Sequence, residues 1–198
     1  GRAHSGKSDK VVFGVFNHYY KITDCMLQTW QKILQRLPKA ELLFKSQVFA
    51  SLSAVETAYW RLQKMGFDMG RVYFEPADNK YMERYLAVDI ALDTYPYPGG
   101  GTTCDALYMG VPVISLYGQR RGSRFGLDFL KTVGLEELAV DSVQAYIERA
   151  VDLAEDKTLL DALHDNIRTM MQHSSLMNTK AYMEELEKAY RQIYAERL

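Results

Sequence analysis

The residues best suited to hold an anion are three consecutive glycines followed by two threonines, at positions 99–103. Glycine lets backbone N–H groups approach a ligand closely, and the start of a helix offers unpaired N–H donors to a negative charge. Asp105 follows one turn later and could accept hydrogen bonds from ribose hydroxyls. No lysine follows the glycines, so this is not a Walker loop. We interpret it as a phosphate cradle, with a flexible glycine turn capped by threonine as the alternative.

A polar and aromatic segment at residues 16–23 contains His18 and Lys21. The lysine could place a point charge on a diphosphate and offset the negative charge that builds up on a leaving group. The alternative is an ordinary exposed lysine in front of a helix cap, which is the commonest role of this residue type.

A third candidate segment, residues 74–84, contains Tyr81 and Arg84 three positions apart. Residues at this spacing share one face of a helix, where a ring could stack on a base and a guanidinium could meet a carbonyl. Alternatively, Tyr81 belongs to the core and Arg84 pairs with Glu83 or Asp89.

The hydrophobic pattern predicts a scaffold that brings these segments together. Apolar runs typical of buried strands occupy residues 11–16, 41–45, 71–75, 90–93 and 113–116. Helical patterns separate them: one begins at the Thr23 cap with Met26, Trp30, Ile33 and Leu34 on one face, and the others span 51–65, 79–87, 102–109 and 125–133. Alternating strands and helices predict a Rossmann-like parallel sheet of five or six strands with helices on both faces. Ligands of such sheets bind at the carboxyl ends of the strands, where the three segments lie.

After Gly134 the pattern becomes helical, at residues 142–154, 158–172 and 180–198. We therefore divide the chain into a disordered or vector-derived tail (1–10), a Rossmann-like lobe (11–140) and C-terminal helices that pack on the lobe (141–198). Composition does not decide whether the last helices lie on the sheet or reach across to another domain.

Charge and cysteine usage limit the classes of partner. The chain has 24 Lys and Arg against 25 Asp and Glu, so no overall field attracts it to nucleic acid or to an anionic membrane. Cys25 and Cys104 lie far apart, which favours free thiols, and the four histidines show no metal-ligand spacing. No apolar run is long enough for a membrane span, so we expect a cytoplasmic protein without a bound metal or cofactor.

Taken together, these motifs resemble the C-terminal catalytic lobe of the O-linked N-acetylglucosamine (O-GlcNAc) transferase family, in its bacterial branch with tetratricopeptide repeats. The resemblance runs from Val11 through nearly the whole chain and is carried by residues 16–22, 89–105, 106–114, 118–124 and 178–186. Members have a GT-B architecture, in which two Rossmann-like lobes face each other across a cleft and the C-terminal lobe holds most of the UDP-sugar.

The resemblance also implies roles for individual residues. Lys21 matches the catalytic lysine that contacts the diphosphate and supports departure of UDP. Tyr81 stands where better-known members have histidine, which fits stacking but not proton transfer, and Gly100 stands where many members have histidine. The residues that match UDP-binding positions are His18, Ala77, Tyr81, Arg84, Gly100, Gly101, Thr102, Thr103 and Asp105.

The resulting hypothesis is the UDP-GlcNAc-binding lobe of an inverting glycosyltransferase that modifies Ser or Thr of a protein acceptor. The N-terminal lobe and helical repeats that supply the acceptor site are missing, so the chain alone should bind UDP weakly and transfer nothing. The alternatives are a non-catalytic UDP-sugar-binding module and a lobe of another GT-B enzyme, such as a UDP-sugar epimerase.

Overall fold

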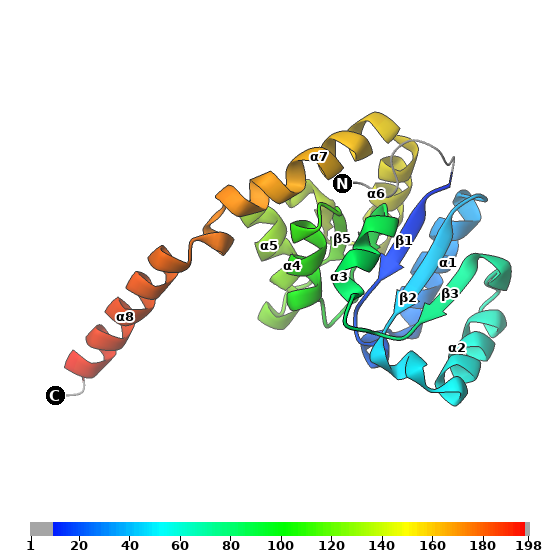
Figure 1. The fold of residues 1–198 in the computed structure, drawn as a ribbon, viewed down its shortest axis with the longest axis horizontal. Helices are drawn as coiled ribbons and strands as arrows, with labels where there is room; N and C mark the ends of the chain where they lie inside the picture. Colours follow the sequence, from blue (N-terminus) through cyan, green and yellow to red (C-terminus); the bar gives the residue numbers. More distant parts are fainter. Residues whose placement is uncertain (1–9, 197–198) are drawn as a thin grey trace.

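A computed structural model describes residues 10–196, and six parallel strands form its single sheet (Figure 1). The strand order is β3-β2-β1-β4-β5-β6. The strands are β1 (Val12–Val15), β2 (Glu41–Lys45), β3 (Val72–Glu75), β4 (Ile90–Leu92), β5 (Val113–Leu116) and β6 (Ala139–Val140). This confirms the predicted Rossmann-like sheet, to which β6 adds the short sixth strand.

The order of the strands reverses next to β1. The chain runs from β1 outward to β2 and β3, and then returns so that β4 pairs with the other edge of β1. Every residue of β1 is buried, as expected of a central strand covered on both faces. The loops that leave β1 and β4 therefore diverge from neighbouring strand ends, which is where sheets of this type bind ligands.

Helices connect the successive strands: α1 (Asp24–Arg36), α2 (Leu52–Lys64), α3 (Tyr81–Arg84), α4 (Gly101–Tyr108) and α5 (Phe125–Val133). In Figure 1, α3 and α4 lie in front of the strands and α1 lies behind them. The predicted cap of α1 is confirmed, because the Thr23 side chain accepts a hydrogen bond from the Met26 backbone N–H. The four apolar residues predicted to share one face of α1 are all buried.

Glycines end three of the helical segments. Gly66, Gly110 and Gly134 follow α2, α4 and α5 and have φ angles of 83°, 79° and 83°. Glycine adopts this left-handed conformation without the strain that a Cβ would cause, which is why it commonly follows the last turn of a helix.

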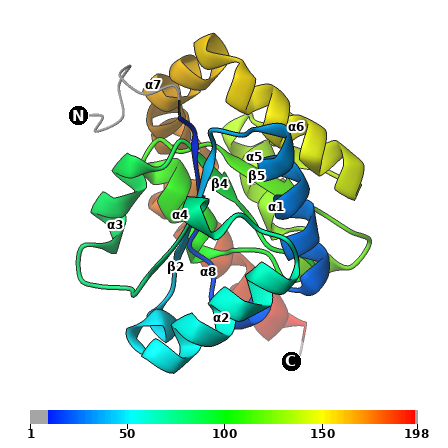
Figure 2. The ribbon, with the colours of Figure 1, turned by 90° about the vertical axis from the view of Figure 1, so that its right-hand side faces the viewer.

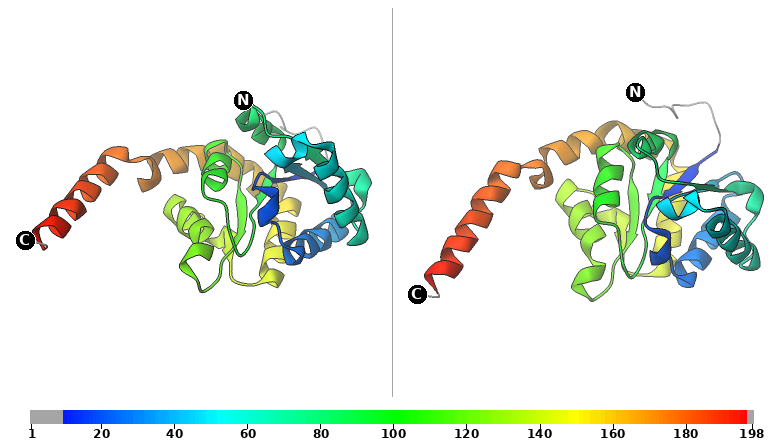
Figure 3. Two further views of the ribbon diagram at one scale, coloured as in Figure 1. Left: turned by 90° about the horizontal axis from the view of Figure 1, so that it is seen from below. Right: turned by 60° about the horizontal axis from the view of Figure 1, so that its bottom comes forward.

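The closing helices are α6 (Val143–Glu155), α7 (Lys157–His173) and α8 (Thr179–Ala195). Helix α6 packs beside α1 (Figure 2), and α7 packs against α4. Helix α8 has no buried residue and projects away from the rest of the protein (Figures 1 and 3).

In the described part of the chain, no helix is long and apolar enough to cross a membrane. Cys25 is exposed, Cys104 is half-buried, and both are free thiols. The predicted tail lies outside the described residues except for Lys10, which forms an ion pair with Glu41 at 2.8 Å.

Candidate functional site

Hydrogen bonds join the loops that follow β1 and β4. The buried Asn17 side chain donates from Nδ2 to Asp93 Oδ1 at 3.1 Å and to Thr94 Oγ1 at 2.8 Å. Asn17 follows β1 and Asp93 follows β4, so these bonds fix the two diverging loops against each other at the reversal point.

Asp93 organises the start of the glycine loop. Its carboxylate is fully buried and accepts from the backbone N–H of Gly99 at 2.7 Å, from that of Thr94 at 2.8 Å and from Ser115 Oγ at 2.8 Å. Burial raises the pKa of Asp93, while these donors and Asn17 lower it by stabilising the charged form. Sequence reasoning had not selected Asp93 as a site residue, although it lies at the carboxyl end of a predicted strand.

The three glycines have different surroundings. A Cβ on Gly99 would lie 2.4 Å from Thr102 Oγ1 and 2.7 Å from Thr103 Oγ1, so no side chain fits there. A Cβ on Gly100 or Gly101 would meet nothing within 4 Å. Helix α4 begins at Gly101, and no side chain caps its first N–H groups. Its N-terminus is therefore open to a ligand, as an anion site requires.

A pocket of about 140 Å³ lies beside this helix start. Four predicted site residues line it, namely His18, Ala77, Tyr81 and Thr102. The other lining residues are Phe16 and three residues at the end of β2, Lys45, Ser46 and Gln47. The β2 residues were missed, although their place after a predicted parallel strand was the signal that could have found them.

Tyr81 and Asp105, both predicted site residues, are joined across α3 and α4. The Tyr81 hydroxyl donates to Asp105 Oδ2 at 3.0 Å, and this hydrogen bond raises the pKa of Tyr81. Tyr81 is 37% exposed, so the alternative that places it in the core is wrong.

Arg84 is bound to a carboxylate that the sequence did not indicate. Its guanidinium makes a bidentate pair with Glu75, donating from Nε to Oε2 at 2.8 Å and from Nη2 to Oε1 at 2.7 Å. The sequence had suggested Glu83 or Asp89 as the partner. The Arg84 guanidinium holds the pKa of Glu75 below its usual range. Arg84 is not among the residues that line the pocket.

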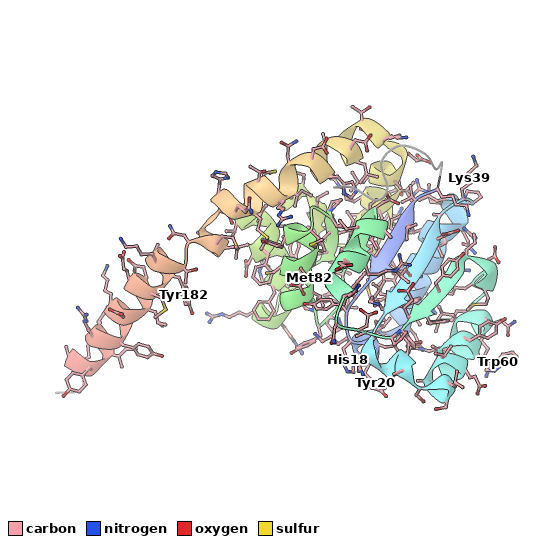
Figure 4. All side chains as sticks on the ribbon, in the orientation of Figure 1. His18, Tyr20, Lys39, Trp60, Met82 and Tyr182 are labelled. Atoms are coloured by element: carbon pink, nitrogen blue, oxygen red, sulfur yellow. The ribbon has the colours of Figure 1, made fainter. Side chains whose placement is uncertain are left out.

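Lys21 lies in the loop after β1 and contacts the loop after β4. It ends a short 3-10 turn, Tyr19–Lys21, and its Nζ lies 4.2 Å from the centre of the Tyr97 ring. The neighbouring His18 and Tyr20 are exposed, with ring centres 5.2 Å apart, below the end of β1 (Figure 4). Of the two loop threonines, Thr103 is buried and Thr102 faces the pocket.

Sequence comparisons with known proteins agree on one family. The model of Glycosyl transferase family 41 matches residues 2–186. The chain is 36% identical over 187 residues to a probable UDP-N-acetylglucosamine–peptide N-acetylglucosaminyltransferase SPINDLY of Petunia hybrida, covering 93% of this chain and 20% of that protein. It thus spans about a fifth of the length of the curated relatives.

Solved structures show the same lobe within larger chains. An O-GlcNAc transferase of Thermobaculum terrenum superposes with a TM-score of 0.89 at 31% identity, over 98% of this chain and 37% of that one. Anabaena HepE, solved in complex with UDP and glucose, has a TM-score of 0.66 at 15% identity, over 91% of this chain and 49% of its own. At that identity HepE supports the GT-B lobe fold alone.

Proposed function

Because this chain belongs to glycosyl transferase family 41, we propose that it is the nucleotide-sugar-binding lobe of a longer protein O-glycosyltransferase. The donor is UDP-GlcNAc or a related UDP-sugar, and the acceptor is a Ser or Thr hydroxyl of a protein. One observation carries the proposal. The open start of α4, Lys21 and the pocket beside them gather at the carboxyl ends of β1 and β4.

The proposed ligand lies along this edge of the sheet. The base enters the pocket between Ala77 and Tyr81, and the ribose hydroxyls reach Asp105, which accepts a hydrogen bond from the Tyr81 hydroxyl. The diphosphate then lies over the backbone of Gly100 and Gly101, where added Cβ atoms would meet open space.

The proposed reaction is a displacement with inversion. The acceptor oxygen attacks the anomeric carbon as the bond from that carbon to the diphosphate oxygen breaks, and UDP leaves with the electron pair. Lys21 and the N–H groups at the start of α4 stabilise the negative charge that develops on the diphosphate. Lys21 must leave the Tyr97 ring to do so, at a cost of about 0.5–1 kcal/mol for an exposed cation–π contact.

We further propose that the remaining part of the parent chain covers α8 and brings the acceptor. One side of α8 carries four apolar residues at helical spacing: Tyr182, Leu186, Tyr190 and Ile193. Three of them, Tyr182, Tyr190 and Ile193, are strongly exposed. Figure 4 shows Tyr182 far from the sheet. An N-terminal lobe preceded by helical repeats, as in a bacterial parent, accounts for this face and for the length of the relatives. The isolated chain then binds the nucleotide but transfers no sugar.

Calorimetric titration of the chain with UDP tests the site. We expect saturable binding that Lys21→Ala and Asp105→Ala both weaken, while the matched control Lys64→Ala, on the exposed end of α2, leaves it unchanged. ADP, CDP and GDP in parallel titrations identify the base that the pocket accepts.

The full-length parent decides between the transferase and its alternatives. Transfer of sugar to a protein hydroxyl supports the proposal. UDP binding without transfer or donor hydrolysis indicates a binding module, and an altered free sugar indicates an epimerase. Absence of nucleotide binding by both the folded chain and the parent would refute the site.

A further inference from the structure

Lys45 is a charged side chain in the base pocket that the proposed reaction does not use. It is the last residue of β2, it lines the pocket, and it is only 4% exposed. In the described part of the chain, Lys45 and Asp93 are the two charged residues with buried side chains. Burying an ammonium group is costly unless partners replace its water, so the contacts of Lys45 indicate what it does.

All the contacts of the Lys45 ammonium that the structure shows fall on one short segment. Its Nζ donates to the Pro76 carbonyl at 2.9 Å and to Asp78 Oδ2 at 3.1 Å, and lies 3.6 Å from Glu75 Oε2. An ammonium has three donors, and here three neighbouring acceptors surround them. The segment they belong to includes Ala77, which forms a wall of the pocket.

The same contacts connect the pocket to its other walls. Glu75 pairs in parallel register with Lys45 on the sheet and receives the bidentate guanidinium of Arg84 from α3. Tyr81, on the same helix, is tied to α4 through Asp105. The chain of contacts from β2 through β3 and α3 to α4 therefore starts at Lys45.

Charge explains why the segment needs this lysine. Hydrogen bonding to Lys45 lowers the pKa of Asp78, and the Arg84 pair lowers that of Glu75, so both carboxylates are ionised near neutral pH. Without Lys45 the two like charges would stand close together at the pocket, and the Pro76 carbonyl would lose its donor.

We propose that Lys45 is a positioning residue that holds residues 75–78 in place and thereby sets which base the pocket accepts. This inference rests on the proposed function, because it concerns the same nucleotide site. It assigns Lys45 to selectivity for the base, whereas Lys21 and the start of α4 serve the diphosphate.

Base selectivity is the measurement that separates this role from a purely structural one. The dissociation constants of UDP and ADP are compared for the wild-type chain, Lys45→Met, Asp78→Asn and the control Lys64→Met, with thermal unfolding recorded for each. We expect the wild type to prefer UDP. Lys45→Met should weaken UDP about tenfold, the scale of one hydrogen bond to a charged group, and ADP much less. Asp78→Asn should act in the same direction by about threefold, because it removes one of the contacts.

The outcomes are distinguishable. A UDP-to-ADP ratio that stays at the wild-type value in folded Lys45→Met and Asp78→Asn would overturn the inference and leave the proposed function intact. If Lys45→Met does not fold, the ratio measured for Asp78→Asn decides, because that side chain is more than half exposed. A wild-type chain that binds UDP and ADP equally would also overturn it. A wild type that binds neither refutes the proposed function itself.

Discussion

Alanine substitutions at Gly99 and Gly101 should separate stability from ligand binding. The Gly99 Cβ would lie 2.4 Å and 2.7 Å from two threonine hydroxyls and 3.2 Å from Asn17 Nδ2, while the Gly101 Cβ would meet nothing within 4 Å. The Gly99 backbone N–H also donates to the buried Asp93 carboxylate, so a shift of this residue disturbs a bond that cannot be replaced by water.

The magnitudes follow from these surroundings. Overpacking a tight site costs typically about 1–3 kcal/mol, so Gly99→Ala should lower the free energy of unfolding by about 2 kcal/mol. For a domain of this size that corresponds to a fall in Tm of about 4–8 °C. Gly101→Ala should leave stability unchanged or raise it by up to about 0.5 kcal/mol, because alanine favours a helix. Its methyl group would stand where the proposed diphosphate approaches, so UDP affinity should fall at least about tenfold.

Urea unfolding followed by circular dichroism and UDP calorimetry test this contrast. The expected pattern is a destabilised Gly99→Ala and a stable Gly101→Ala that binds UDP poorly. If Gly101→Ala binds UDP like the wild type, the diphosphate does not lie over the start of α4. If Gly99→Ala is as stable as the wild type, the loop is looser than its contacts indicate.

Changes at Asp93, Glu75, Tyr97 and α8 test other parts of the reasoning. Asp93→Asn should cost about 1 kcal/mol, because an amide oxygen can replace the acceptor, whereas Asp93→Ala should cost about 3 kcal/mol by leaving buried N–H groups unpaired; urea unfolding measures both. Burial raises the pKa of Asp93 in the folded state above its value in the unfolded chain. Stability therefore falls as the pH rises from the unfolded pKa to the folded pKa, and Asp93→Asn should make Tm depend less on pH in that range. The pair with Arg84 lowers the pKa of Glu75, so the ionised carboxylate stabilises the fold, and this stabilisation is lost as the pH falls below about 4.5. The Tm of Glu75→Gln should therefore fall less than that of the wild type between about pH 6 and 3. Tyr97→Leu should strengthen UDP binding about two- to fivefold by removing a competing contact of Lys21, and a weaker affinity in calorimetry would mean that the ring touches the ligand. Deletion of α8 should change the Tm by less than about 2 °C in a thermal scan, because none of its residues is buried.

The parts of the fold that sequence reasoning predicted correctly are those with local signals. The fully apolar run of β1 and the Thr23 cap of α1 each depend on residues next to one another in the chain. The edge at which the candidate residues gather followed from one topological rule about parallel sheets. The short β6 was harder, because two residues carry no periodicity.

The parts that were missed depend on contacts distant in the chain. In the sequence, Lys45 is simply a polar residue at the end of a strand. Its burial depends on β3, which places Glu75 beside it in parallel register. Asp93 has partners from the loop after β1, from β5 and from its own loop, separated by up to 76 positions. Arg84 pairs with Glu75, nine residues earlier at the end of β3, and the sequence had suggested Glu83 or Asp89 instead.

Lys21, Lys45 and Arg84 lie around the site and have partners of different kinds, which fits different roles. Lys45 and Arg84 are held by carboxylates, and replacing either set of partners would cost charge-assisted hydrogen bonds. Lys21 instead rests on an aromatic face, an interaction that is weaker and needs no counter-ion. A cation held in this way keeps its charge available for an anionic ligand at little cost. Lys45 at the end of β2 is therefore fixed in place by its partners. In the proposed function, Lys21 after β1 moves to bind the diphosphate.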